Sequence, residues 1–276
     1  MSSQKPYFND ALIQLKSAGF STPFGDCRRL LEYSTGHCSI FNSEAFLVDK
    51  HIRKIFKFSI RRRLSKEPIS HIVGFRDFWK SKFLVNQSVL DPRPETELIV
   101  EKVVSGALSG ASILELGTGT GCIAISIALE RPDLKICASE ISFEALNVAK
   151  HNAKNLGAKV NFFHSDWFKE VRQSFDLIIS NPPYLSVKDL AALPLDIQRF
   201  EPRIALDAGK YGLDCIHIIA EKLSHYLNPK GIGLFEIGVN QKEMVKKLFN
   251  SYGFHDIQFF LDLEKRERVV CVKKDA

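Results

Sequence analysis

The tetrad Asn181-Pro182-Pro183-Tyr184 has residue types that could together hold a planar NH2 group. It follows the apolar run Phe175–Ser180, which predicts a buried strand. Each proline lacks a backbone N–H and fixes its own φ, so the chain is stiff just past the strand end. The Asn181 side-chain carbonyl and nearby backbone carbonyls can accept hydrogen bonds, and Tyr184 adds a flat aromatic face. The alternative interpretation is an ordinary turn after a strand.

A glycine-rich loop, Glu115-Leu116-Gly117-Thr118-Gly119-Thr120-Gly121, lies between a predicted strand and a predicted helix. Its glycines permit a tight turn and a close approach of the backbone to a ligand. The Gly-Lys-Ser/Thr of a phosphate loop is absent, and a dinucleotide G-x-G-x-x-G would need glycine where Cys122 stands. The loop by itself therefore does not identify its ligand.

Acidic and aromatic residues follow the next two predicted strands. Glu140 stands 19 residues past Gly121, where an acid can bind both hydroxyls of a ribose. Asp166 and Trp167 come after the following strand, and they suit an adenine, since a carboxylate accepts from its amine and an indole stacks on its ring. Core packing is the alternative role for Trp167. These residues predict an adenosine site across three strand ends, with Asn181 at the same edge.

The elements that must position these residues alternate between strand-like and helix-like runs from residue 112 onward. The predicted strands are Ser112–Leu116, Lys135–Ser139, Lys159–Phe163, Phe175–Ser180, Gly231–Ile237, His255–Phe260 and Val269–Val272. The predicted helices are Gly121–Leu129, Ser142–Leu156, Leu213–Tyr226 and Gln241–Tyr252. This alternation predicts an α/β fold with a Rossmann-like, seven-stranded, mostly parallel sheet and helices on both faces.

The N-terminal third differs in charge and pattern. Residues 1–85 carry 15 basic and 7 acidic side chains, a net +8, whereas the remainder carries 23 and 25, a net −2. Residues 1–70 are predicted to be helical. The segment Lys50–Lys66 holds eight Lys and Arg and no acid, with Ile52, Phe56, Ile60 and Leu64 spaced by four. This amphipathic basic helix has either a solvated face or a docking face for a protein or nucleic acid.

Between these parts, residues 69–90 favour two short strands, Ile69–Phe75 and Phe78–Val85, as a hairpin. His71, a lone histidine among aliphatic residues, is interpreted as structural. The following segment Asp91–Glu97 is predicted to be a rigid loop that leads into a helix, and its spacing does not decide whether it borders a site. The predicted domains are residues 1–70, a hairpin linker at 71–90, and a catalytic domain at 91–276.

Composition limits the class of protein. The chain is 45% hydrophobic and 25% charged, and no run approaches the roughly 18 apolar residues of a membrane span. The start of the sequence shows no apolar signal segment. The six cysteines include no C-x-x-C pair, which predicts reduced thiols, no disulfide framework and no zinc site. We therefore expect a cytoplasmic protein without a metal.

The glycine loop and the tetrad resemble those of class I S-adenosylmethionine-dependent methyltransferases, in the branch that methylates amino groups of adenine, cytosine or glutamine. Further stretches resemble a single family within that branch. They are Glu67-Pro68-Ile69-Ser70-His71, Phe78-Trp79, Pro92-Arg93-Pro94-Glu95-Thr96-Glu97, Ser165-Asp166-Trp167-Phe168, and Arg199-Phe200-Glu201-Pro202 with Ala205-Leu206. That family is the protein-(glutamine-N5) methyltransferases of peptide chain release factors, and the resemblance covers nearly the whole chain.

The resemblance implies a cofactor, a substrate and site residues. The cofactor would be S-adenosylmethionine, and the substrate the glutamine of the Gly-Gly-Gln loop of release factors, whose methylation modulates translation termination. The implied cofactor-binding residues are Gly117, Thr118, Gly119, Thr120, Gly121, Glu140, Trp167 and Asn181. Asp166 is added to them because it follows a predicted strand. Asn181, Pro182, Pro183 and Tyr184 would hold the glutamine, with Asn181, Pro182 and Tyr184 catalytic. A monomer with no obligatory nucleic acid is expected.

Two departures and three alternatives accompany the resemblance. The family usually has Asp where this chain has Glu140, and the run Asp207–Leu213 is less acidic than expected. One alternative is a ribosomal-protein glutamine methyltransferase. Another is an adenine-N6 nucleic-acid methyltransferase, although the net −2 of the catalytic part would bind a phosphate backbone weakly. A non-catalytic binding module is disfavoured because the chain has both the loop and the tetrad.

Overall fold

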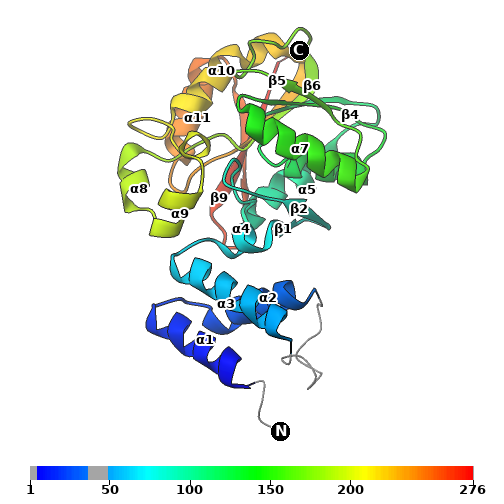
Figure 1. Cartoon of the computed structure of the whole chain (residues 1–276). Helices are drawn as coiled ribbons and strands as arrows, with labels where there is room; N and C mark the ends of the chain where they lie inside the picture. The colour runs from blue at the N-terminus through cyan, green and yellow to red at the C-terminus, as the bar shows by residue number, and fades with distance from the viewer. Residues whose placement is uncertain (1–4, 37–48, 276) are drawn as a thin grey trace. The chain divides into compact units, whose positions relative to one another are not determined.

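The computed structural model describes residues 5–36 and 49–275, which form two compact units (Figure 1). The first unit contains the chain up to Phe75 together with Pro194–Phe200, and the second contains Arg76–Leu193 and the chain from Glu201 onward. Cys38 and parts of the predicted helical region 1–70 lie outside the described residues. No helix among the described residues is long and apolar enough to cross a membrane.

The first unit is helical, as the sequence predicts. Its first four helices are α1 Lys5–Ser17, α2 Pro23–Thr35, α3 Lys50–Leu64 and α4 Ile69–Val73. Helix α3 begins where the Asp49 carboxylate accepts a 2.6 Å hydrogen bond from the His51 N–H, a side-chain cap. Phe56 and Ile60 on its apolar face are buried against Leu15 and Leu30 of the preceding helices.

The polar side of α3 is divided between buried pairs and an exposed row. Arg62 donates to Glu67 at 2.8 Å and Arg63 to Asp26 at 2.8 Å, and both acids are buried. A second set of basic residues is exposed and recurs at helical spacing along one face. We call this set the basic stripe: Lys50, Lys54, Lys57 and Arg61.

The predicted strand Ile69–Phe75 is wrong. Residues Ile69–Val73 form α4, which ends at Gly74, whose φ is +82° and whose N–H donates to the Ser70 carbonyl at 2.7 Å. The hairpin follows instead, with β1 at Phe75–Phe78 and β2 at Ser81–Leu84. A short apolar run fits a strand or a buried helical turn equally well, so periodicity could not separate them.

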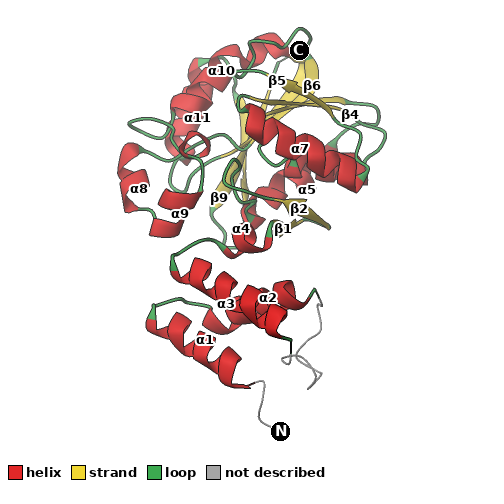
Figure 2. Ribbon diagram, viewed as in Figure 1, coloured by secondary structure: helices red, strands yellow, loops and turns green. Residues whose placement is uncertain are grey.

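The second unit is built on a seven-stranded sheet with the order β5-β4-β3-β6-β7-β9-β8 (Figure 2). Its strands are β3 Ser112–Leu116, β4 Lys135–Glu140, β5 Asn161–His164, β6 Phe175–Ser180, β7 Leu227–Glu236, β8 Asp256–Leu261 and β9 Glu267–Lys273. The pairs from β5 through β7 are parallel, and β9 is antiparallel to both of its neighbours. This confirms the predicted mostly parallel sheet.

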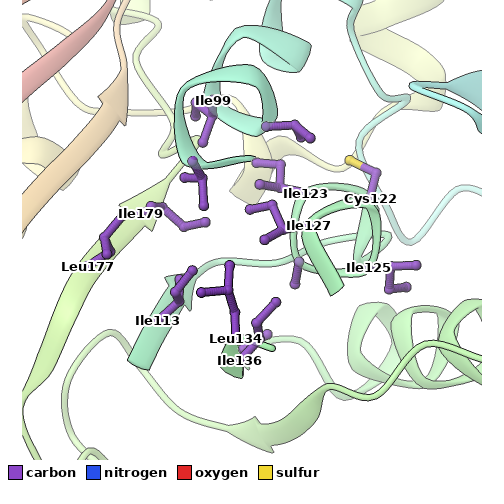
Figure 3. Close-up of a cluster of buried hydrophobic side chains, with 14 of the residues drawn as sticks. Ile99, Ile113, Cys122, Ile123, Ile125, Ile127, Leu134, Ile136, Leu177 and Ile179 are labelled. Carbon is purple, nitrogen blue, oxygen red and sulfur yellow. The ribbon is translucent and has the colours of Figure 1, made fainter. Parts of the chain in front are cut away.

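Helices cover both faces of this sheet (Figures 1 and 2). The remaining helical elements are η2 Pro94–Thr96, α5 Glu97–Gly106, α6 Cys122–Glu130, α7 Phe143–Leu156, α8 Val187–Ala192, α9 Leu195–Phe200, η3 Arg203–Ala205, α10 Asp214–Tyr226 and α11 Lys242–Ser251. Successive residues of β6 point to opposite faces, so Leu177 and Ile179 join the core under α5 and α6 (Figure 3). Ile178 joins the core under α10 and α11.

Strand register brings four chain segments to one edge of the sheet. Leu116 at the end of β3 pairs with Ser139 of β4 and with Ser180 of β6, and Glu140 pairs with His164 of β5. The strand order reverses at β3, since the chain runs outward through β4 and β5 and then returns to β6 on the other side. Ligands of open α/β sheets bind at the carboxyl ends of the strands beside such a reversal.

Candidate active site

A cavity of about 530 Å³ lies at this edge of the sheet. It is lined by residues from the ends of β3, β4, β5 and β6 and by two further segments, 88–90 and 202–207. Of the residues predicted to bind cofactor or substrate, the lining includes Gly117, Gly119, Glu140, Asp166, Trp167, Asn181, Pro182 and Pro183. Thr118, Thr120, Gly121 and Tyr184 lie outside the lining.

The three loop glycines are required for different reasons. Each has positive φ, at +68°, +55° and +80° for Gly117, Gly119 and Gly121. A Cβ on Gly117 or Gly119 would meet no atom within 4 Å, since both residues border the cavity. A Cβ on Gly121 would lie 2.7 Å from Ile125 Cδ1 and 3.2 Å from the Ala149 Cβ of α7. The first two glycines leave room for a ligand, and the third allows the helices to pack.

A buried acid supports the loop from below. Glu115 accepts from the Thr118 hydroxyl at 2.6 Å and from the Ala124 N–H at 3.1 Å, which ties the loop to the start of α6. Only 1% of Glu115 is exposed, and this burial raises the pKa of its carboxyl to about 8. The Thr118 side chain is turned into the interior, where it holds the loop and does not border the cavity.

Glu140 lies beside the loop in the wall of the cavity. Its Oε2 accepts from the Gly119 N–H at 2.9 Å, and its Oε1 accepts from the Ile141 and Ser142 N–H groups at 2.9 and 3.0 Å. A carboxylate has about four acceptor sites. Three of them are directed at the backbone, so Glu140 orders the loop as well as bordering the space where a ribose is predicted.

Asp166 and Trp167 border the same cavity beyond the end of β5. Asp166 Oδ2 forms a 2.6 Å ion pair with Lys169. Trp167 has a φ of +49°, which is uncommon for a bulky residue, and its carbonyl accepts from the Ser165 hydroxyl at 2.8 Å. The indole also packs against the core under α10, so Trp167 combines core packing with a place in the cavity wall.

The tetrad is held rigidly past the end of β6. Among the described residues, no backbone N–H donates to the Pro182 or Pro183 carbonyl. Gln241 donates to the Tyr184 carbonyl at 2.9 Å and to the Gly212 carbonyl at 3.0 Å. A Cβ on Gly212 would lie 2.5 Å from the Tyr184 carbonyl oxygen, so the segment that departs from the family pattern supports the tetrad.

Two residues to which the sequence analysis gave no role form a hydrogen-bond chain with Asn181. The Asn181 Nδ2 donates to Thr96 Oγ1 at 3.1 Å, and Thr96 Oγ1 donates to Glu236 Oε2 at 2.6 Å. Glu236 also accepts from the Tyr184 hydroxyl, and its burial raises the pKa of its carboxyl to about 7. Thr96 is 85 residues from Asn181 and Glu236 is 140 residues from Thr96. The sequence signals were an acid near the end of an apolar strand, and a stretch around Thr96 that resembles the family but whose role the spacing left undecided.

The segment Asp91–Glu97, whose role its spacing had left open, reaches the site through the bond of Thr96 to Asn181, and none of its residues lines the cavity. Arg93 pairs with Glu201, whose side chain is buried, and Leu90 lies in the cavity wall. Arg93 also lies 4.0 Å from the Asp91 carboxylate. His71 belongs to the first unit, where it is buried on α4.

The chain is similar to known methyltransferases in sequence and in fold. The methyltransferase small domain family matches residues 88–193. Release factor glutamine methyltransferases from Caulobacter vibrioides and Buchnera aphidicola are each 36% identical, with 95% and 98% of this chain aligned to 93% and 99% of theirs. The chain belongs to the release factor glutamine methyltransferase family. Bifunctional methyltransferases of Rickettsia typhi are 35% identical, and the chain spans 57% of their length.

Solved structures share the fold of the second unit. A methyltransferase from Pyrococcus furiosus superposes with a TM-score of 0.56 at 20% identity, covering 70% of this chain and 89% of its own. A T. thermophilus 16S rRNA methyltransferase, solved with AdoMet and guanosine, gives 0.52 at 16% identity and covers 72% and 49%. These likenesses show that the chain contains the fold of these methyltransferases.

Proposed function

We propose that the protein transfers a methyl group from S-adenosylmethionine to the side-chain amide N5 of the Gly-Gly-Gln glutamine of a peptide chain release factor. The observation that carries this proposal is the register of β3 with β6, since it sets the glycine loop and the tetrad side by side on one cavity. Relatives of nearly the same length as this chain are release factor glutamine methyltransferases, which supports the choice of substrate.

The residues around the cavity fit the cofactor. Gly117 and Gly119 leave open space where side chains would stand, and Glu140 offers a carboxylate with one acceptor site beyond its backbone bonds. Asp166 and Trp167 supply a carboxylate and an aromatic ring for an adenine. When bound, S-adenosylmethionine would supply an activated sulfonium methyl group.

The tetrad would align the amide that receives this methyl group. Asn181 Oδ1 and the Pro182 carbonyl would each accept one amide hydrogen, which directs the nitrogen lone pair toward the cofactor. Held in this way, the amide nitrogen would accept the methyl group that the bound cofactor supplies, and the amide proton would leave to water. Tyr184 is proposed to pack beside the amide, although its hydroxyl is already bonded to Glu236. The main contribution of the protein is alignment of the reacting atoms.

The first unit is proposed to dock the release factor, with its boundary near residues 70–75. The basic stripe supports this role, because its four side chains are exposed on one face of α3, whereas Arg62 and Arg63 are engaged inside the unit. The second unit, by contrast, contains most of the acidic residues of the chain. The basic stripe would attract a partner protein whose surface is rich in acidic side chains.

The decisive experiment measures transfer of labelled methyl from S-adenosylmethionine to separate substrates. These are a purified release factor, the same factor with its Gly-Gly-Gln glutamine changed to alanine, and bulk ribosomes or RNA. Label on the intact factor alone is expected. Label on ribosomes or RNA, with none on the factor, would move the substrate to a ribosomal protein or a nucleic acid and overturn the proposal.

Asn181→Ala tests the tetrad in the same assay. Because one amide hydrogen loses its acceptor, kcat is expected to fall by about 100-fold or more, the order seen when one aligned polar group is removed from an active site. Cofactor affinity, measured by calorimetry, should fall much less. Full activity in this variant would exclude the proposed role of Asn181.

A further inference from the structure

The hydrogen-bond chain that links Asn181, Thr96 and Glu236 has a direction set by chemistry. Thr96 has a single hydroxyl proton, and it is directed at Glu236 Oε2 at 2.6 Å. While Glu236 is ionised and only accepts, the Thr96 oxygen is left to accept from Asn181, so the Asn181 NH2 faces Thr96. Its Oδ1 is then turned away from Thr96. All three side chains belong to the second unit, and Thr96 and Glu236 are 2% and 1% exposed.

We propose that Thr96 and Glu236 are positioning residues that fix the rotation of the Asn181 amide, so that Oδ1 and not Nδ2 meets the substrate nitrogen. This inference rests on the proposed amide-methylating function. An Asn side chain can rotate by 180° and exchange its donor and its acceptor at little steric cost. With Nδ2 toward the substrate, two NH2 groups would face each other and no hydrogen bond could align the target.

The charge state of Glu236 decides which way the chain runs. An ionised carboxylate only accepts, which forces both Thr96 and Tyr184 to donate to it. A protonated carboxyl can donate to Thr96, whose own proton can then go to Asn181 Oδ1 and turn the amide around. The titratable or charged groups that act on Glu236 are Glu95 of η2, Cys122 of α6, Tyr184 and Arg268 of β9. Burial raises the pKa of Glu236 to about 7, so both states occur near neutrality.

The kinetic test compares the wild type with Thr96→Val, Thr96→Ser and Glu236→Gln, each assayed on the release factor between pH 5.5 and 8.5. Thr96→Val is expected to lower kcat by about 10- to 100-fold, with the dissociation constant of S-adenosylmethionine within about threefold of wild type. Thr96→Ser keeps the hydroxyl and should restore most of the rate. In the wild type kcat should fall below about pH 7, and Glu236→Gln should lack this decline.

Asp176→Asn is the matched control. Asp176 lies near the start of β6, away from the carboxyl edge, and accepts from Ser112 and Asn228 at 2.8 Å. This change removes a polar network from the same strand, so its kcat per folded molecule should equal that of the wild type. A wild-type kcat for Thr96→Val, or a decline below pH 7 that persists in Glu236→Gln, would overturn the positioning role.

A second measurement does not depend on activity. In full-length protein labelled with ¹⁵N-Asn, the side-chain NH2 signal of Asn181, assigned by its loss in Asn181→Ala, should shift with a midpoint near pH 7. It should not shift in Glu236→Gln or Thr96→Val. If the wild type methylates no release factor, the proposed function fails while this signal still decides the positioning role. An Asn181 signal without pH dependence in the wild type would contradict the inference.

Discussion

The Glu140 carboxylate accepts a 2.9 Å hydrogen bond from the Gly119 N–H, which ties the end of β4 to the glycine loop after β3. Its other oxygen accepts from Ile141 and Ser142 at the start of the segment that leads into α7. One acidic side chain therefore joins two strand ends on the wall of the cavity.

Glu140→Ala is expected to weaken binding of S-adenosylmethionine at least tenfold. The loss follows because a charged acceptor, typically about 1.5–3 kcal/mol per hydrogen bond, is removed from a cavity wall. Glu140→Asp should retain the bonds to Ile141 and Ser142, lose the bond to Gly119, and bind with intermediate affinity. Isothermal titration calorimetry measures both constants. Unchanged affinity in Glu140→Ala would show that the carboxylate orders the loop but does not bind the cofactor.

Gly121→Ala and Gly119→Ala should separate packing from ligand binding. Both place a side chain at positive φ, but only the Cβ at position 121 meets Ile125 Cδ1, at 2.7 Å. Gly121→Ala should lower the free energy of unfolding by about 2–4 kcal/mol, from overpacking added to backbone strain. Gly119→Ala should lose about 1 kcal/mol and bind cofactor poorly, because its Cβ enters the cavity. Urea denaturation and calorimetry test the pair, and equal destabilisation would contradict the packing argument.

The buried acid Glu115 should make stability depend on pH. Its pKa rises from 4.5 to about 8 on folding, so between these values the folded state binds more protons than the unfolded state. The free energy of unfolding should therefore decrease as pH rises from 5 to 8, by up to about 1.4 kcal/mol per pH unit from this group. Glu236, with a pKa of about 7, adds a decrease of the same sign.

Glu115→Gln keeps an oxygen that can accept from Thr118 and Ala124 but cannot ionise. Urea denaturation at pH 5, 6.5 and 8 should show a smaller decrease in this variant than in the wild type. Glu221→Gln, on the exposed side of α10, serves as the control and should follow the wild type. A variant slope equal to that of the wild type would contradict the assignment.

Reversing the charge of the basic stripe should weaken binding of the protein substrate selectively. Lys54→Glu, Lys57→Glu and Arg61→Glu together are expected to raise KM for a full-length release factor about tenfold at low salt, and less at high salt. Methylation of a short Gly-Gly-Gln peptide should be spared. The control reverses the exposed residues Lys222, Lys246 and Lys247 of the second unit. An equal rise in KM for the control, or for the peptide, would exclude docking by α3.

The sequence by itself determined the strands of the seven-stranded sheet, their mostly parallel arrangement, and which chain segments lie at the cavity. Alternating apolar runs define a buried parallel sheet locally, and parallel strand ends share an edge, so Gly117, Glu140 and Asn181 could be grouped without coordinates. The Ile69–Val73 helix was missed because a five-residue segment with three apolar residues has no distinctive period.

Only the tertiary structure decided what contacts these residues. Thr96 bonds to Asn181 across 85 residues, and Glu236 bonds to Thr96 across 140 residues, separations that no local pattern encodes. The tertiary structure also separated Arg62 and Arg63, which pair with buried acids, from Lys54 and Arg61 on the exposed face. Residue types and spacing specify which groups are available, whereas hydrogen-bond partners, burial and the resulting pKa values depend on distances that arise when distant segments pack together.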